Sequence, residues 1–71
     1  MEFLLVTYPE SRKVLVDGKE SGLTNETLVL NKGTHKVSLA GAADYRPPSV
    51  VVRLSGTTSI KPREVRFEKI S

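Results

Sequence analysis

The chain has 71 residues and no cysteine, and its 11 lysines and arginines against 8 aspartates and glutamates give a formal net charge of +3 at pH 7. This length fits one domain, residues 1–71, near the lower limit at which a chain folds alone. Without cysteine there is neither a disulfide framework nor a thiolate metal site. The charges are spread without a run of one sign, which is typical of an ordinary solvated surface and not of a strongly nucleic-acid-binding domain.

The opening stretch, residues 1–8, is apolar but too short to cross a membrane, and it lacks a basic leader and a small-residue cleavage site. We therefore expect no membrane insertion of this segment. If Met1 is the natural start, the expected location is the cytoplasm. If the sequence is part of a longer exported chain, the expected location is the cell envelope, and the residues alone leave the compartment open.

Apolar residues alternate with a period of two in nearly every segment between turn residues, which is the spacing of β-strands and not of an amphipathic helix. The first expected strand spans 3–8 and is apolar on both faces, so we place it centrally in its sheet. Pro9 begins a turn, and the second expected strand spans 13–16. Asp17-Gly18 then suits the positive φ values of a tight hairpin, which continues weakly over 19–22.

Further turn residues separate the later strands. Asn31-Lys32-Gly33 is a three-residue turn that places its glycine at positive φ. The longest irregular segment, 41–48, contains Pro47-Pro48, which cannot donate to a strand ladder and so predicts a loop or a sheet edge. The remaining expected strands span 27–30, 34–40 and 50–54, with a last one around 65–67.

About six or seven short strands at roughly ten-residue spacing predict an all-β fold, either a small antiparallel β-sandwich or a small barrel. We expect mostly antiparallel pairing and favour the sandwich. The alternation also predicts which side chains face the core: Leu5, Val14, Val16, Leu28, Leu30, Val37, Leu39, Val50, Val52, Leu54, Val65 and Phe67.

The turn and strand residues follow a distinctive order: Pro9-Glu10-Ser11-Arg12, Val14-Leu15-Val16-Asp17-Gly18-Lys19, Gly22, Thr24, Leu28, Leu30, Gly33, His35, Val37, Leu39 and Asp44-Tyr45. This order resembles the PEGA domain, a short β-module named for its Pro-Glu-Gly-Ala motif, over residues 6–67. The sequence departs from the pattern at Ser11-Arg12, where the motif has Gly-Ala, and at Asn25 and Asp44, where the pattern has proline and glycine.

The resemblance implies a transthyretin-like or carboxypeptidase-regulatory-like sandwich of the kind found in bacterial and archaeal multidomain envelope proteins, lipoproteins and kinases. Such modules are thought to bind or space without catalysing a reaction. The resemblance therefore implies no catalytic residue and no cofactor.

The single histidine, His35, is in phase with the inward residues of its strand, so we expect it to be partly buried and hydrogen-bonded. A metal would need partner ligands that no cysteine or second histidine supplies, and a catalytic triad would need a serine that the sequence does not place. Asp17 beside its glycine turn lacks the spacing of a calcium loop. We expect no catalytic or metal site.

Two surfaces are candidates for contact with a partner. The first is the loop Asp44, Tyr45, Arg46 and Pro47, where an aromatic and an arginine lie on a proline-stiffened segment; the alternative is that Tyr45 folds back over the core. The second is a basic patch of Lys36, Arg53 and Arg66, with Lys61 and Arg63 nearby, whose alternative is a solvated face interleaved with Glu64 and Glu68.

These observations favour a non-catalytic binding or spacer module for a protein or an envelope polysaccharide. It would act through the loop and through a free sheet edge that accepts an added strand. The alternative function is a small basic nucleic-acid-binding β-barrel, which would show binding that falls steeply with salt. Nucleic acid is the less favoured partner, and a small hydrolase is the least favoured class for want of a nucleophile and base.

Overall fold

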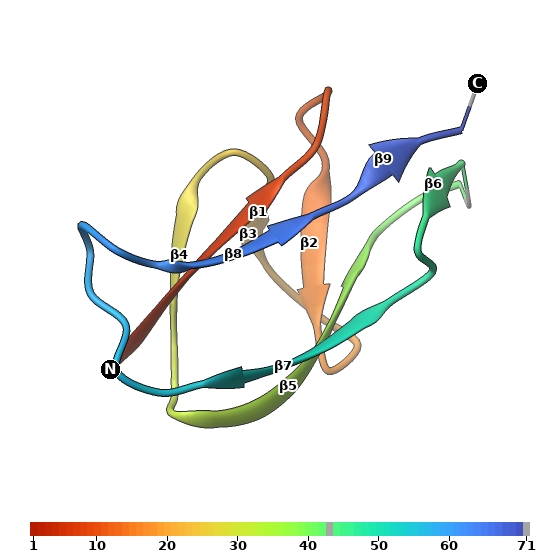
Figure 1. Ribbon diagram of the computed structural model, residues 1–71. Helices are drawn as coiled ribbons and strands as arrows, with labels where there is room; N and C mark the ends of the chain where they lie inside the picture. The colour runs from red at the N-terminus through yellow and green to blue at the C-terminus, as the bar shows by residue number, and fades with distance from the viewer. Residues whose placement is uncertain (43, 71) are drawn as a thin grey trace.

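The computed structural model describes residues 1–42 and 44–70 of the chain, which fold as β-strands separated by short turns (Figure 1). The strands up to residue 54 are short because a proline, a glycine or an Asx residue follows each of them within two residues. The strands are β1 (Glu2–Thr7), β2 (Lys13–Val16), β3 (Lys19–Leu23), β4 (Thr27–Leu30), β5 (Gly33–Leu39), β6 (Tyr45–Arg46), β7 (Val50–Leu54), β8 (Arg63–Arg66) and β9 (Glu68–Lys69). Within these residues no helix is long and apolar enough to span a membrane.

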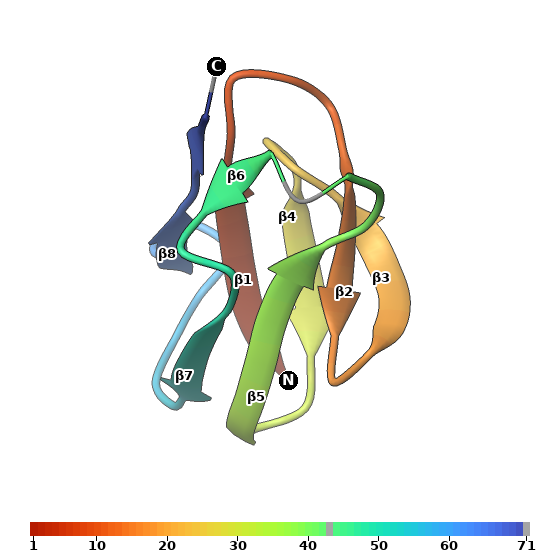
Figure 2. The same ribbon diagram turned by 90° about the vertical axis from the view of Figure 1, so that its right-hand side faces the viewer.

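The strands form two main sheets that pack face to face (Figure 2). One sheet has the order β4-β1-β8 and the other the order β3-β2-β5-β7. A third, two-stranded ladder joins β6 to β9. The predicted all-β sandwich is confirmed, and so is the central place of β1 in its sheet.

Five of the six strand pairings among the described residues are antiparallel, as expected, and β1 with β8 is the parallel one. The parallel pair joins the beginning of the chain to its end, with Val6 opposite Val65. Local turn signals report only hairpins between neighbouring strands, so they do not predict this pairing.

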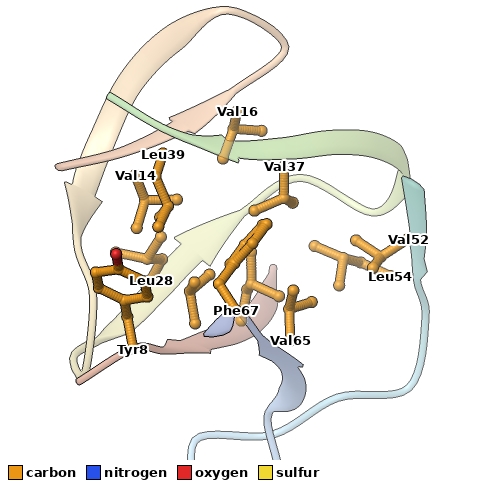
Figure 3. Close-up of a cluster of buried hydrophobic side chains, with 12 residues drawn as sticks. Tyr8, Val14, Val16, Leu28, Val37, Leu39, Val52, Leu54, Val65 and Phe67 are labelled. Atoms are coloured by element: carbon orange, nitrogen blue, oxygen red, sulfur yellow. The ribbon is translucent and has the colours of Figure 1, made fainter. Parts of the chain in front are cut away.

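The core lies between the two sheets, where side chains from both inner faces interdigitate (Figure 3). Nine of the expected inward residues are buried there, and Leu30 and Val50 are half-buried against the same cluster. The buried set is Leu4, Val6, Tyr8, Val14, Val16, Leu28, Val37, Leu39, Val52, Leu54, Val65 and Phe67.

The expectation for Leu5 is wrong, because the opposite face of β1 points inward, with Leu4 and Val6 fully buried. Both faces of this strand are apolar, so alternation alone gives it no phase. Glu2 obscures the phase further, because it lies on the inward face. Its carboxylate accepts hydrogen bonds from the backbone N–H and the hydroxyl of Thr57, at 3.0 and 2.7 Å, which hold its pKa below the usual range.

The turn between β2 and β3 has the predicted conformation, with φ of 53° at Asp17 and 84° at Gly18. Positive φ at both central residues gives a hairpin turn whose twist matches that of the strands. The turn before β5 likewise places Gly33 at a φ of 131°. These two turns lie at the same end of the four-stranded sheet, because β2 and β5 pair with each other in antiparallel register.

Candidate functional site

The predicted contact loop, Asp44 to Pro48, has a half that faces inward and a half that faces solvent. Tyr45 is half-buried against the core. Its hydroxyl donates to the Leu39 carbonyl at 2.9 Å and accepts from the Leu39 N–H at 3.2 Å. Its ring meets that of Phe67 edge-on, with centroids 5.4 Å apart. Of the two alternatives for Tyr45, the structure therefore shows the one in which it covers the core.

Arg12 holds this half of the loop in place. Its guanidinium lies over the rings of Tyr8 and Tyr45, 5.5 and 5.9 Å from their centroids. It donates to Asp44 Oδ1 at 2.6 Å and to the Ala42 carbonyl at 3.2 Å. The hydrogen bond from Arg12 lowers the pKa of the Asp44 carboxyl. Asp44 and Tyr45 therefore both make contacts within the molecule, although the Asp44 side chain stays 36% exposed.

The outward half of the loop, Arg46 and Pro47, is exposed and lies beside β8 and β9. Together with Arg66 and Glu68 it lines a hollow of about 350 Å³. Arg46 Nε donates to Glu68 Oε2 at 3.3 Å across the β6–β9 ladder. The structure thereby brings together one residue from each predicted surface, Arg46 from the loop and Arg66 from the basic patch.

A second and larger hollow, of about 730 Å³, lies on the other side of Arg66 and Glu68, over the end of β1. Asn25 and Lys69 are among the residues that line it. Lys69 pairs with Glu10, which raises the lysine pKa. The side chains of Arg66 and Glu68 therefore separate two shallow depressions on one surface.

The edge of β8 that faces away from β1 is unpaired among the described strands. In the segment that follows β8, the Phe67 N–H donates to the Thr7 carbonyl of the β1 side, whereas the Ile70 N–H donates to the Asp44 carbonyl on the β6 side. Backbone groups of successive strand residues point to opposite edges. Glu64 and Arg66 therefore direct their N–H and C=O groups toward the free edge.

At the end of β8 that leads into β9, the edge is already covered by β6. β6 and β9 lie side by side at one end of the molecule (Figure 1), with Arg46 opposite Glu68. The next residue of the chain that would face this edge is Pro48, which has no N–H to continue the ladder. The open part of the edge is thus the four-residue strand β8, and the 350 Å³ hollow marks the place where β6 leaves it.

The three cations of the predicted basic patch do not share one sheet. Lys36 of β5 and Arg53 of β7 are exposed on neighbouring strands of the four-stranded sheet, where Lys36 is opposite Val51 and Arg53 opposite Thr34. Arg66 lies on β8 of the other sheet. Only Lys36 and Arg53 are therefore close in register.

His35 is partly covered and hydrogen-bonded, as the sequence predicts, with a side chain 15% exposed. Its Nδ1 lies 3.1 Å from Asp17 Oδ2, and its Nε2 lies 2.7 Å from the Asn31 carbonyl. Both partners are acceptors, so they favour the doubly protonated ring, and they raise the His35 pKa, the Asn31 carbonyl most strongly. The hydrogen bonds connect the turn after β2 to the turn before β5.

Among residues 1–42 and 44–70, no three or more His, Cys, Asp or Glu side chains gather in a way that would hold a metal ion. The hydrogen-bond partners of His35 are the Asp17 carboxylate and the Asn31 carbonyl, and neither is a hydroxyl or thiol whose proton the ring would remove. The chemistry that these contacts provide is hydrogen bonding between two turns.

Asn25 and Arg12 are structural residues of this surface that the sequence reasoning missed. Asn25 has a φ of 65°, and its side chain pairs with the backbone of Tyr8, accepting from the N–H at 3.2 Å and donating to the carbonyl at 2.9 Å. The available signal was the tolerance of asparagine for positive φ in a turn. For Arg12 there was no local signal, because its partners are 4 to 33 residues away in the chain.

Comparisons with models of known protein families, with curated proteins and with solved structures found no match. The resemblance to the PEGA domain stays a prediction from the order of the turn and strand residues. The fold alone places the chain among small all-β sandwiches.

Proposed function

We propose that this chain is a non-catalytic binding module that takes up an extended polypeptide segment along the free edge of β8. The observation that carries the proposal is the edge itself, where the backbone groups of Glu64 and Arg66 point away from β1 beside a hollow. An added strand supplies partners for such groups, and pockets beside the edge give it side-chain selectivity. Arg46 and Arg66 at the hollow attract an acidic side chain of the incoming segment.

The same observation favours a polypeptide over the polysaccharide that the sequence left open. An unpaired strand edge presents N–H and C=O groups at the spacing of another strand. No aromatic ring lines the hollow, whose walls are Arg46, Pro47, Arg66 and Glu68. The alternative of a nucleic-acid-binding barrel gains no support, because its three cations are divided between two sheets.

The test compares two substitutions of Arg66 that differ in one backbone donor. Arg66→Pro and Arg66→Thr both remove the guanidinium, but only the proline removes the N–H at the free edge, where the native ladder with β1 does not need it. Short random peptides are first selected on the immobilised wild-type chain, and their affinities for both variants are then measured by fluorescence anisotropy. We expect the proline variant to bind roughly tenfold more weakly than the threonine variant, the effect of one lost hydrogen bond.

Urea unfolding of both variants checks that each keeps the fold, so that weaker binding is read at the edge and not through the core. Equal affinity of the two variants contradicts strand addition at β8. Selection that recovers no peptide contradicts the binding function and leaves the spacer role. Retention of nucleic acid at low salt alone would point to a weak cationic surface.

A further inference from the structure

We propose that the segment taken up by the free edge of β8 is β8 of a second copy of this chain, paired antiparallel about a two-fold axis at Val65. The inference rests on the proposed function of the same edge and names its partner. Three properties of β8 support it: which residues direct their backbone groups to the free edge, which charges these residues carry, and where β6 of the same chain already covers the edge.

The backbone directions limit the possible registers. Only Glu64 and Arg66 of β8 direct their N–H and C=O groups to the free edge, as judged from the Phe67 to Thr7 hydrogen bond. In an antiparallel pair, two residues that exchange hydrogen bonds lie directly opposite each other. Three symmetric registers satisfy this condition: Glu64 opposite itself, Arg66 opposite itself, or Glu64 opposite Arg66.

The first two registers are unfavourable. With Glu64 opposite its own copy, like charges meet, and Arg66 faces Pro62, which has no N–H to donate. With Arg66 opposite its own copy, like charges meet again. Glu64 would then face Glu68, whose edge is already paired with Arg46 of β6.

The third register satisfies every condition. With the axis at Val65, Glu64 of each copy lies opposite Arg66 of the other, so two pairs of opposite charge form side by side. Four backbone hydrogen bonds accompany them, because each of the two pairs exchanges two. The added strand ends before Glu68, where β6 begins to cover the edge.

The hollow beside β8 strengthens this register. Arg46 stands opposite Glu68, and the incoming Glu64 would stand opposite Arg66, two residues further along the same face. The hollow lined by Arg46, Pro47, Arg66 and Glu68 therefore receives the Glu64 carboxylate beside two guanidinium groups, one of which already pairs with Glu68. The result is one continuous sheet in which the order β4-β1-β8 is repeated across the two-fold axis.

A single pair of short strands is a small contact, so the association is weak and its extent depends on concentration. The charged side chains also exclude other registers, since each register that opposes like charges is penalised. The charges of Glu64 and Arg66 thus disfavour pairing of β8 with other strand edges, while the same two residues favour pairing with β8 of a second copy.

The experiment is sedimentation equilibrium of the wild-type chain over a wide concentration range, beside charge-reversal variants. E64R and R66E each place like charges opposite one another in both pairs, so we expect each alone to weaken the dimer by roughly tenfold or more. The double variant E64R/R66E restores opposite charges in both pairs and should dimerise more tightly than either single variant. It should dimerise less tightly than the wild type, because the incoming arginine that E64R introduces then lies beside Arg46. An equimolar mixture of the two single variants should form a mixed dimer, because one then carries two cations and the other two anions.

Lys19→Glu, a charge reversal on exposed strand β3 of the other sheet, is the matched control and should leave the dimer unchanged. A wild-type chain that stays monomeric at every concentration overturns the inference, as does a dimer that E64R and R66E leave intact. Failure of the mixed dimer to form also overturns it. If the wild-type chain is monomeric but binds selected peptides, and the Arg66→Pro variant binds them more weakly, the proposed function stands and only the self-pairing is overturned.

Discussion

At the scale of single residues, two tyrosines that touch the same arginine differ in what their hydroxyls do. The Tyr45 hydroxyl makes two hydrogen bonds to the backbone of Leu39, beyond the last residue of β5 that pairs with β7. The Tyr8 hydroxyl is buried and has no partner among the described residues. Removal of a bonded hydroxyl costs stability, whereas removal of an unbonded buried one relieves a desolvation cost.

We therefore expect Tyr45→Phe to lower the free energy of unfolding by roughly 1–3 kcal/mol, since it leaves the Leu39 backbone groups unpaired. Tyr8→Phe should leave stability equal to that of the wild type or slightly above it. Urea unfolding monitored by circular dichroism measures both, and each variant is the control for the other. Equal losses in the two variants would contradict the assignment of Tyr45 as the hydroxyl that closes the end of β5.

The sequence could place Tyr45 on an irregular segment beside two prolines but could not choose between a partner and the core. The choice depends on Arg12 and Phe67, which lie 33 and 22 residues away and are brought to the tyrosine by the sheets. A residue whose contacts are all long-range carries no local pattern that reports them. The same holds for Arg46 and Arg66, which the structure joins at one hollow.

At the scale of strands, β3 and β4 approach one another closely at Gly22. A Cβ atom there would overlap Cδ2 of Leu28, a buried core residue, so any larger residue requires the Leu28 side chain to shift. We expect Gly22→Ala to lower the free energy of unfolding by about 1–3 kcal/mol through overpacking. The change should appear as a lower urea midpoint with an unchanged m-value.

Ser21→Ala, at the neighbouring exposed position of β3, is the control and should shift the midpoint little. A Gly22→Ala variant as stable as this control would show that Leu28 moves aside at no cost. In that case the close approach of the two strands is not what requires glycine at this position.

The strands differ in how well the sequence predicted them. In β5 polar Lys36 and Ser38 flank Val37, and in β7 Arg53 separates Val52 from Leu54, so the inward sets of both strands were correctly predicted. β1 is apolar on both faces, and its phase was therefore assigned wrongly at Leu5. The pairing of β1 with β8 was not predicted, because a parallel pair between chain ends depends on the closure of the whole fold.

At the scale of the molecule, the proton on His35 links the hairpin turn between β2 and β3 to the turn that connects β4 of one sheet with β5 of the other. The ring bridges Asp17 of the turn after β2 and the Asn31 carbonyl of the turn before β5, while Asp17 Oδ1 accepts the Lys36 N–H at 2.9 Å. A neutral ring has one N–H and cannot donate to both acceptors. When the ring loses a proton, the lone pair of one ring nitrogen faces a lone pair of its acceptor oxygen. One of the two hydrogen bonds is therefore lost.

The sign of the pH dependence follows from the direction of each pKa. The pKa of His35 is raised above 6.5, so its contribution to stability is complete below that value and is lost as pH rises through the higher folded value. The pKa of Asp17 is lowered below 3.8 by the hydrogen bonds from the Lys36 N–H and His35, so its contribution is present above 3.8 and is lost as pH falls through the folded value. The connection between the turns is strongest between these two limits.

We expect the free energy of unfolding to be higher near about pH 5 than near about pH 8, with the difference reduced in His35→Gln, whose side chain does not titrate. Urea unfolding of the wild type and of His35→Gln at the two pH values measures the effect. Subtracting the pH-dependent change of the variant from that of the wild type removes the contribution of all other titrating groups. Proton NMR of the His35 ring gives its pKa directly, expected above 6.5. A ring that titrates at or below that value, or equal pH dependence in both chains, would show that the two turns hold together without the imidazolium.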